Sequence, residues 1–213
     1  MKQFTPLLIL LTVFYSCSND KKETPVTDNL PAPVVVKDSA LVTDTSWGLI
    51  TSKADIASLQ SLYGIANIKD ERVCGPECAD SIDVTFIYRN TKNEMTIYWN
   101  DSAYHKTISF IESSDPEASY HTATGLKTGS ALNDLLKLNG KKITFSGFDW
   151  DYGGLIQSYN DGILENSPVH FQLGLYEDGY DSLIGDIELN TDMPAVKKAL
   201  DKIKVTQLSL TFN

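Results

Sequence analysis

Short stretches in which polar and apolar residues alternate make up much of this chain beyond residue 47. Strict alternation over four to eight residues is typical of a strand with one buried face. A polar turn at 89–94 separates two of these stretches, and Asn160-Asp161-Gly162 separates two later ones, as in β-hairpins. The pattern predicts strands at 84–88, 95–99, 107–111, 142–146, 155–159, 169–175 and 205–212.

Leucines at helical spacing predict two short helices, at 53–63 and 131–139. Ser52 and Ser130 precede these segments and are expected to cap their first turns, while Gly64 and Gly140 follow their last turns. A third helix is expected at 194–202, because Pro194 suits the first turn of a helix. Short connections and hairpins favour an α+β fold, with antiparallel sheets and short helices.

The first two predicted helices belong to a repeated pattern, in which a glycine and a short extended piece precede the helix and a second glycine ends it. The pattern covers 48–64 and 125–140, and it suggests two tandem α/β units at 47–115 and 119–213. It resembles small lipoproteins of the outer-membrane assembly machinery and the tandem modules of β-lactamase inhibitor proteins. The resemblance implies a binding or assembly role without enzymatic activity, and it assigns no functional residue.

The first twenty residues have the pattern of an export signal. Lys2 precedes the apolar run 7–14, and Ser16 places a small residue directly before Cys17. The run is too short to span a bilayer, which needs about 20 apolar residues. This segment resembles the signals of bacterial lipoproteins, which implies cleavage after residue 16 and acyl chains, such as palmitate, on Cys17. The alternative is an ordinary secretory signal in which Cys17 is incidental.

Residues 18–46 contain scattered prolines and no amphipathic period, which predicts a flexible tether. A coil of this length has a root-mean-square span of about 30 Å. The expected organisation is a signal at 1–16, a lipidated N-terminus and tether at 17–46, and a globular region at 47–213. The expected location is the cell envelope, facing away from the cytoplasm, on the outer membrane or cell surface rather than the inner membrane. The lipid on Cys17 would make the membrane itself a partner.

The chain carries a formal net charge of −10, and this charge is unevenly distributed. No Lys or Arg occurs between Ile143 and Val196, a stretch that holds ten acidic residues. Recognition of phosphates needs a basic surface, so the charge argues against nucleic acid as a partner. The acids either keep the surface soluble or form a face for a cationic partner or divalent cations.

The segment 149–154 begins like a calcium-binding loop, with acidic residues at its first and third positions and glycine at its sixth. An EF-hand has a bidentate Glu at the twelfth position, where this chain has Asn160, so the EF-hand interpretation fails. A looser calcium site remains an alternative. Its candidate ligands are Asp149, Asp151, Asp178 and Asp181.

Phe148, Trp150 and Tyr152 alternate with these acids and are expected on one face of a strand. Such a face belongs either to the core or, where it is exposed, to a partner surface, because aromatic anchors dominate many interfaces.

Cys74 and Cys78 flank the residues Gly75-Pro76-Glu77. Outside the cytoplasm two such cysteines are expected to pair in a structural disulfide. The alternatives are a thioredoxin-like redox pair, a metal site and free thiols. The spacing differs from a redox pair by one residue, and zinc would need further ligands that the neighbouring sequence lacks.

Motifs for catalysis are missing from the sequence. There is no nucleophile elbow, zinc-protease helix or phosphate-binding loop, and His105, His121 and His170 are scattered. The favoured function is a membrane-tethered, extracytoplasmic binding or assembly lipoprotein without catalytic activity, acting with an unidentified envelope protein and no cofactor. The alternatives are a hydrolase using acids between Asp149 and Asp181, or a calcium-stabilised surface-binding protein.

Overall fold

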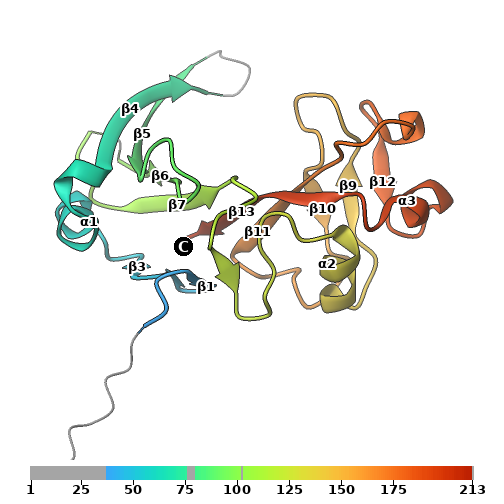
Figure 1. The fold of residues 1–213 in the computed structure, drawn as a ribbon, viewed down its shortest axis with the longest axis horizontal. Coiled ribbons are helices and arrows are strands. Elements are labelled where there is room, and N and C mark those ends of the chain that lie inside the picture. Colours follow the sequence, from blue (N-terminus) through green and yellow to red (C-terminus); the bar gives the residue numbers. More distant parts are fainter. Residues whose placement is uncertain (1–36, 76–79, 102, 213) are drawn as a thin grey trace, which may run out of the picture. The chain divides into compact units, whose positions relative to one another are not determined.

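The structure is a computed structural model that describes residues 37–75, 80–101 and 103–212. Its largest element is a six-stranded antiparallel sheet with the strand order β11-β13-β7-β6-β5-β4 (Figure 1). The strands are β4 (Ile68–Cys74), β5 (Ser81–Ile87), β6 (Met95–Trp99), β7 (Ile108–Ser113), β11 (Val169–Gly174) and β13 (Lys204–Thr211).

The two faces of this sheet differ because side chains alternate along each strand. Ile97, Ile111 and Leu210 are cross-strand neighbours on the face that joins the core, and each is completely buried. Thr96, Glu112 and Ser209 form the adjacent row on the opposite face. The alternation in the sequence therefore corresponds directly to the two faces of the sheet.

Two smaller sheets complete the strands. One has the order β3-β2-β1-β8, where β1 (Leu41–Thr43) pairs antiparallel with β2 (Ser46–Trp47) and parallel with β8 (His121–Thr122), and β3 is Ile50–Thr51. The other has the order β10-β9-β12, formed by β9 (Thr144–Ser146), β10 (Ile156–Ser158) and β12 (Glu188–Asn190). These short strands contribute completely buried side chains to the core, among them Trp47, Ile50 and Phe145.

Three short α-helices pack against these sheets in the described part of the chain: α1 (Ile56–Tyr63), α2 (Leu132–Asn139) and α3 (Pro194–Ala199). Short 3₁₀ turns lie at Ile65–Asn67 (η1) and Asp181–Leu183 (η3). The predicted α+β fold, with antiparallel sheets and short helices, is confirmed. Figure 1 shows α2 and α3 near the small sheet of β9, β10 and β12, and α1 near β4.

The predicted N-caps of the first two helices are wrong, whereas Gly64 ends α1 as predicted. Asp55, not Ser52, caps α1, because its carboxylate accepts hydrogen bonds from the backbone N–H and the hydroxyl of Ser58, at 2.8 and 2.6 Å. The N-cap of α2 is Ala131, without a side-chain bond, and the Ser130 hydroxyl instead accepts the backbone N–H of Lys127. The predicted glycine stop of α2 is confirmed, since Gly140 adopts the left-handed conformation with φ of 70°.

The six-stranded sheet takes strands from both of the proposed units at 47–115 and 119–213. β13 pairs with β7 along residues 208–211 and with β11 on its other side. Residues 36–213 accordingly belong to one compact unit. Within the described residues, no helix is long and apolar enough to cross a membrane.

Candidate functional site

A surface groove lies where β1 and β8 meet the segment 163–171, and it is called the β1–β8 groove here. Its volume is about 280 Å³. Its floor is apolar and consists of side chains from β1, the loop after β8, α2, and β11 with the segment that precedes it: Val42, Leu126, Leu138, Leu164, Val169 and Phe171. The groove therefore joins four segments that are distant in the sequence.

The rim of the groove combines one exposed apolar side chain with hydroxyls and one carboxylate. Ile163 is 75% exposed, although isoleucine is among the residues most often buried. Thr43, Thr122 and Ser167 supply hydroxyls, and Asp44 supplies the carboxylate. A concave apolar surface with a few polar groups at its edge is typical of a ligand-binding site.

Asn139, the last residue of α2, positions one wall of the groove. It is 1% exposed, and its side-chain amide donates to the carbonyl oxygen of Tyr159 at 2.8 Å and that of Lys141 at 2.9 Å. Its Oδ1 accepts the backbone N–H of Leu164 at 3.2 Å. These three bonds hold the loop that presents Ile163 and Leu164 to the groove.

Gly162 is required in that loop because the backbone passes so close to Asn139. A Cβ atom at residue 162 would lie 2.1 Å from Oδ1 of Asn139, far inside van der Waals contact. The Asn160-Asp161-Gly162 turn seen in the sequence therefore serves this contact as well as the chain reversal. The sequence showed the turn, but not the buried asparagine that it packs against.

The predicted aromatic face of Phe148, Trp150 and Tyr152 is not one face. Phe148 forms an isolated β-bridge with Ile184, whereas Trp150 lies in a bend and Tyr152 in a turn, so the three side chains do not alternate along one strand. Phe148 is buried against Phe145, with a ring centroid distance of 5.9 Å. Trp150 is half-buried and donates its indole N–H to the carbonyl oxygen of Gly147, while Tyr152 is 49% exposed.

Phe148, Asp149, Asp178 and Asp181 do meet, around a hollow of about 220 Å³ that Tyr176 and Tyr180 also line. Asp151 does not line this hollow. Among the described residues, no group of three or more His, Cys, Asp or Glu side chains is placed to hold a metal ion. Calcium binding at these residues stays a prediction.

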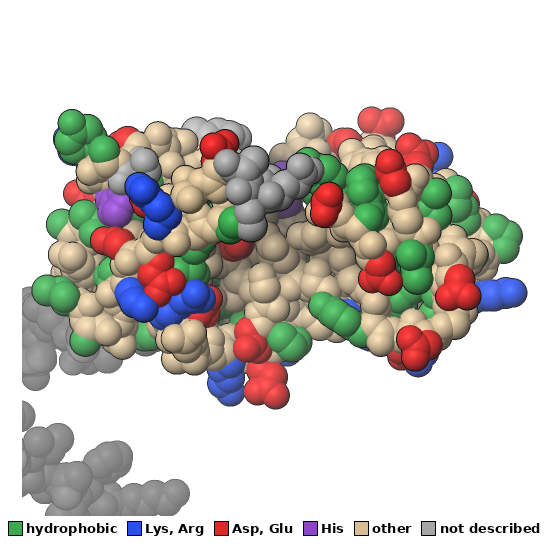
Figure 2. All heavy atoms as spheres, turned by 90° about the horizontal axis from the view of Figure 1, so that it is seen from above, with side chains coloured by type: hydrophobic (Ala, Val, Ile, Leu, Met, Phe, Trp, Pro, Cys, Tyr) green, Lys and Arg blue, Asp and Glu red, His purple; other side chains and the backbone are tan. Residues whose placement is uncertain are grey.

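The acids of this region are directed to solvent. Asp149, Asp178 and Asp181 are all exposed, whereas the general acid of a hydrolase is typically shielded from water. On the face shown in Figure 2, carboxylates form separate spots over the half of the molecule that carries β9, β12 and α3. Among the described residues, none of the aspartates in this hollow is shielded as the general acid of the hydrolase alternative would be.

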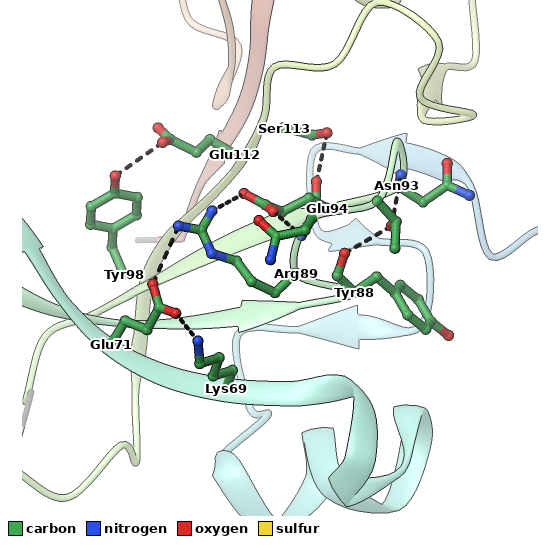
Figure 3. A network of polar contacts seen from close by, with 11 residues as sticks. Lys69, Glu71, Tyr88, Arg89, Asn93, Glu94, Tyr98, Glu112 and Ser113 are labelled. Atoms are coloured by element: carbon green, nitrogen blue, oxygen red, sulfur yellow. Dashed lines mark hydrogen bonds and ion pairs between the residues drawn. The ribbon is translucent and has the colours of Figure 1, made fainter.

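A polar network lies on the six-stranded sheet and was not anticipated from the sequence (Figure 3). Arg89 bonds both Glu94, at 2.7 Å, and Glu71, at 3.3 Å, and Glu71 also pairs with Lys69. The hydrogen bond from Lys69, followed by the attraction of both cations, lowers the pKa of Glu71. This network fastens the β5–β6 turn to β4.

Glu112 lies on the same sheet, between two neutral donors. One carboxylate oxygen accepts the Tyr98 hydroxyl at 3.0 Å, and the other accepts the side-chain amide of Gln207 at 2.7 Å. Burial raises the pKa of Glu112, and the hydrogen bond from Tyr98 opposes that shift. Burial, together with the nearby Glu112 charge, also raises the pKa of Tyr98. A carboxylate and a tyrosine on adjacent strands were the only sequence signal for this contact.

Comparison with known proteins adds one weak likeness. No family model matches the chain, and no curated protein matches it. Among solved structures, it is similar to the crystal structure of the uncharacterized protein yfeY from Escherichia coli, with 15% sequence identity and a TM-score of 0.44. The match covers 80% of this chain and 99% of that chain. A likeness at this level carries no argument about function.

The cysteine predictions fall partly outside the described residues. Cys74, at the end of β4, is disulfide-bonded. Cys17 and Cys78 lie outside the described residues, so lipidation of Cys17 and the pairing of Cys74 with Cys78 stay predictions.

Proposed function

We propose that this chain is a membrane-tethered, extracytoplasmic binding lipoprotein that acts without catalysis. Acyl chains on Cys17 would hold it on the cell envelope, and the tether at 18–46 would hold its folded part away from the lipid headgroups. Support for the anchor comes from the signal pattern that ends at Cys17.

The observation that carries the binding role is the β1–β8 groove. Its floor side chains come from four segments, and the buried Asn139 fixes one wall, so the groove is a built feature of the fold. Burial of apolar ligand surface there would contribute about 25 cal/mol per Å² of area removed from water. Within the part of the chain that the structure describes, Asp44 is the one acid or base in the groove lining.

The anchor is tested in growing cells with the full chain. Cys17→Ala is expected to move the protein out of the membrane fraction and to remove the acyl mass from its N-terminal peptide. Asn19→Ala, two residues away, is expected to change neither. An unmodified N-terminal peptide in the wild-type protein would exclude the lipoprotein interpretation.

The binding role is tested by photo-crosslinking in the same cells. A benzoylphenylalanine is placed at residue 163, on the rim of the groove, and in a second protein at residue 104, whose tyrosine is 71% exposed outside the groove lining. We expect an adduct from position 163 and none from position 104, with mass spectrometry identifying the added group. Failure of position 163 to form any adduct would count against binding in the groove.

A further inference from the structure

Among the described residues, Asp44 is the only charged side chain that lines the β1–β8 groove. It lies in the turn between β1 and β2, at the edge of the apolar floor, and it is exposed. Its carboxylate has no hydrogen bond or ion pair with another described residue. A single unpaired anion therefore stands beside an apolar surface.

The hydroxyls of the rim are engaged in their own turns. Thr43 bonds the Ser46 hydroxyl at 3.0 Å, Thr122 bonds the Thr124 hydroxyl at 2.9 Å, and the Ser167 hydroxyl accepts the backbone N–H of Val169 at 3.1 Å. An anionic head group is recognised by strong donors, most often Arg or Lys. No Lys, Arg or His lines the groove among the described residues. A carboxylate or phosphate placed at this rim would meet Asp44 without a compensating cation.

A cationic head group has the opposite fit. It would lie beside the Asp44 carboxylate while an attached apolar chain covered Val42, Leu164 and Phe171 on the floor. The net charge of −10 also attracts cations to the protein and repels anions from it.

We propose that the β1–β8 groove binds an amphiphile with a linear apolar chain and an ammonium head group, and that Asp44 selects the charge of the head. This inference rests on the proposed binding function and names its ligand class. Apolar burial supplies the attraction for the chain, and the ion pair at the rim supplies the discrimination between head groups.

The test measures protection of a thiol in the groove, using the full chain in isolated cell membranes. Ala123 is exposed and lines the groove, so Ala123→Cys places a small reporter there. Its rate of labelling by a water-soluble maleimide is measured with octylammonium, octanol or octanoate, and the chain without this substitution gives the background. We expect octylammonium to protect the thiol at concentrations about twofold to fivefold lower than octanoate, the range of an exposed ion pair.

Two further variants separate the charge effect from the apolar effect. Asp44→Asn is expected to remove the preference for octylammonium and to leave protection by octanol unchanged. Asp186→Asn, at an exposed acid that does not line the groove, is expected to keep the preference.

Each other outcome has a distinct meaning. Equal protection by all three compounds, or a preference that survives Asp44→Asn, would overturn the charge selection and leave the binding role intact. Protection by none of them would overturn both. A thiol that is already blocked in untreated membranes and that a bifunctional maleimide links to a second polypeptide would show a protein occupant, which contradicts an amphiphile.

Discussion

Asn139 offers a direct test of how the groove wall is built. Asn139→Ala removes an amide that makes three hydrogen bonds with backbone groups, at Lys141, Tyr159 and Leu164. The Lys141 carbonyl belongs to an exposed residue, so water can replace that bond. The Tyr159 carbonyl keeps the backbone N–H of Gly162, at 3.1 Å, as a second donor. The N–H of the buried Leu164 would lose its partner.

The magnitude follows from the Leu164 N–H. Leaving one buried polar group unsatisfied costs about 1–3 kcal/mol, so the expected loss in the free energy of unfolding is about 2 kcal/mol. In a domain of this size that corresponds to a decrease in melting temperature of roughly 4–8 °C. The loop that carries Ile163 and Leu164 should loosen as well, which would weaken protection of the Ala123→Cys reporter by octanol.

Urea denaturation followed by tryptophan fluorescence measures the effect, and α2 provides its own control. Asn133 lies on the same helix, and its amide bonds Asp201 at the surface, at 2.9 Å. Asn133→Ala is expected to cost less than about 0.5 kcal/mol, as at most surface positions. The reasoning is refuted if the two alanine variants unfold at the same urea concentration.

Three further predictions concern other parts of the molecule. Burial raises the pKa of Glu112, so the folded state binds the carboxyl proton more tightly than the unfolded state does. The protonated Glu112 therefore stabilises the fold at low pH, and this contribution is lost as the pH rises through the folded-state pKa. Relative to wild type, Glu112→Gln should therefore gain stability in urea titrations as the pH rises above 4.5, the ordinary pKa of a glutamate, and a relative loss would contradict the assignment. Asp55→Ala should lower the melting temperature by a few degrees, because it removes the N-cap of α1. Ser52→Ala, at the N-cap position that the sequence predicts, should leave the melting temperature unchanged. Equal shifts in the two variants would refute Asp55 as the cap. Under the calcium alternative, millimolar calcium should raise the melting temperature and a chelator should reverse the rise, so an unchanged melting temperature would contradict that alternative.

Local patterns of polar and apolar residues predicted the strands of the large sheet better than they predicted the β1–β8 groove. The strands β6, β11 and β13 were visible because each buries alternate residues, a signal that any short segment carries by itself. β4 was missed, since Lys69-Asp70-Glu71-Arg72 places four charges in succession on the edge strand of the sheet. An edge strand can keep such charges because both of its faces reach water.

The groove could not be predicted because no single segment contains it. Val42, Leu126 and Phe171 become neighbours only through the parallel pairing of β1 with β8 and the return of the chain into β11. Asn139 looked like a helix stop, and its role depends on a glycine 23 positions later in the sequence. The acidic stretch between Ile143 and Val196 gave a conspicuous signal, but composition alone does not determine where side chains converge.

The position of β13 has a consequence for biosynthesis. The last strand of the chain lies between β7 and β11, so the large sheet stays divided until residues 204–211 are available. Strands that are far apart in the sequence pair slowly, because the chain loses the entropy of the intervening loop before the contacts between the strands form. A chain still being synthesised would hold β4–β7 as one meander and β11 without its neighbour. In the exported protein proposed above, completion of the large sheet would therefore wait for residues 204–211, which favours passage across a membrane in an unfolded state.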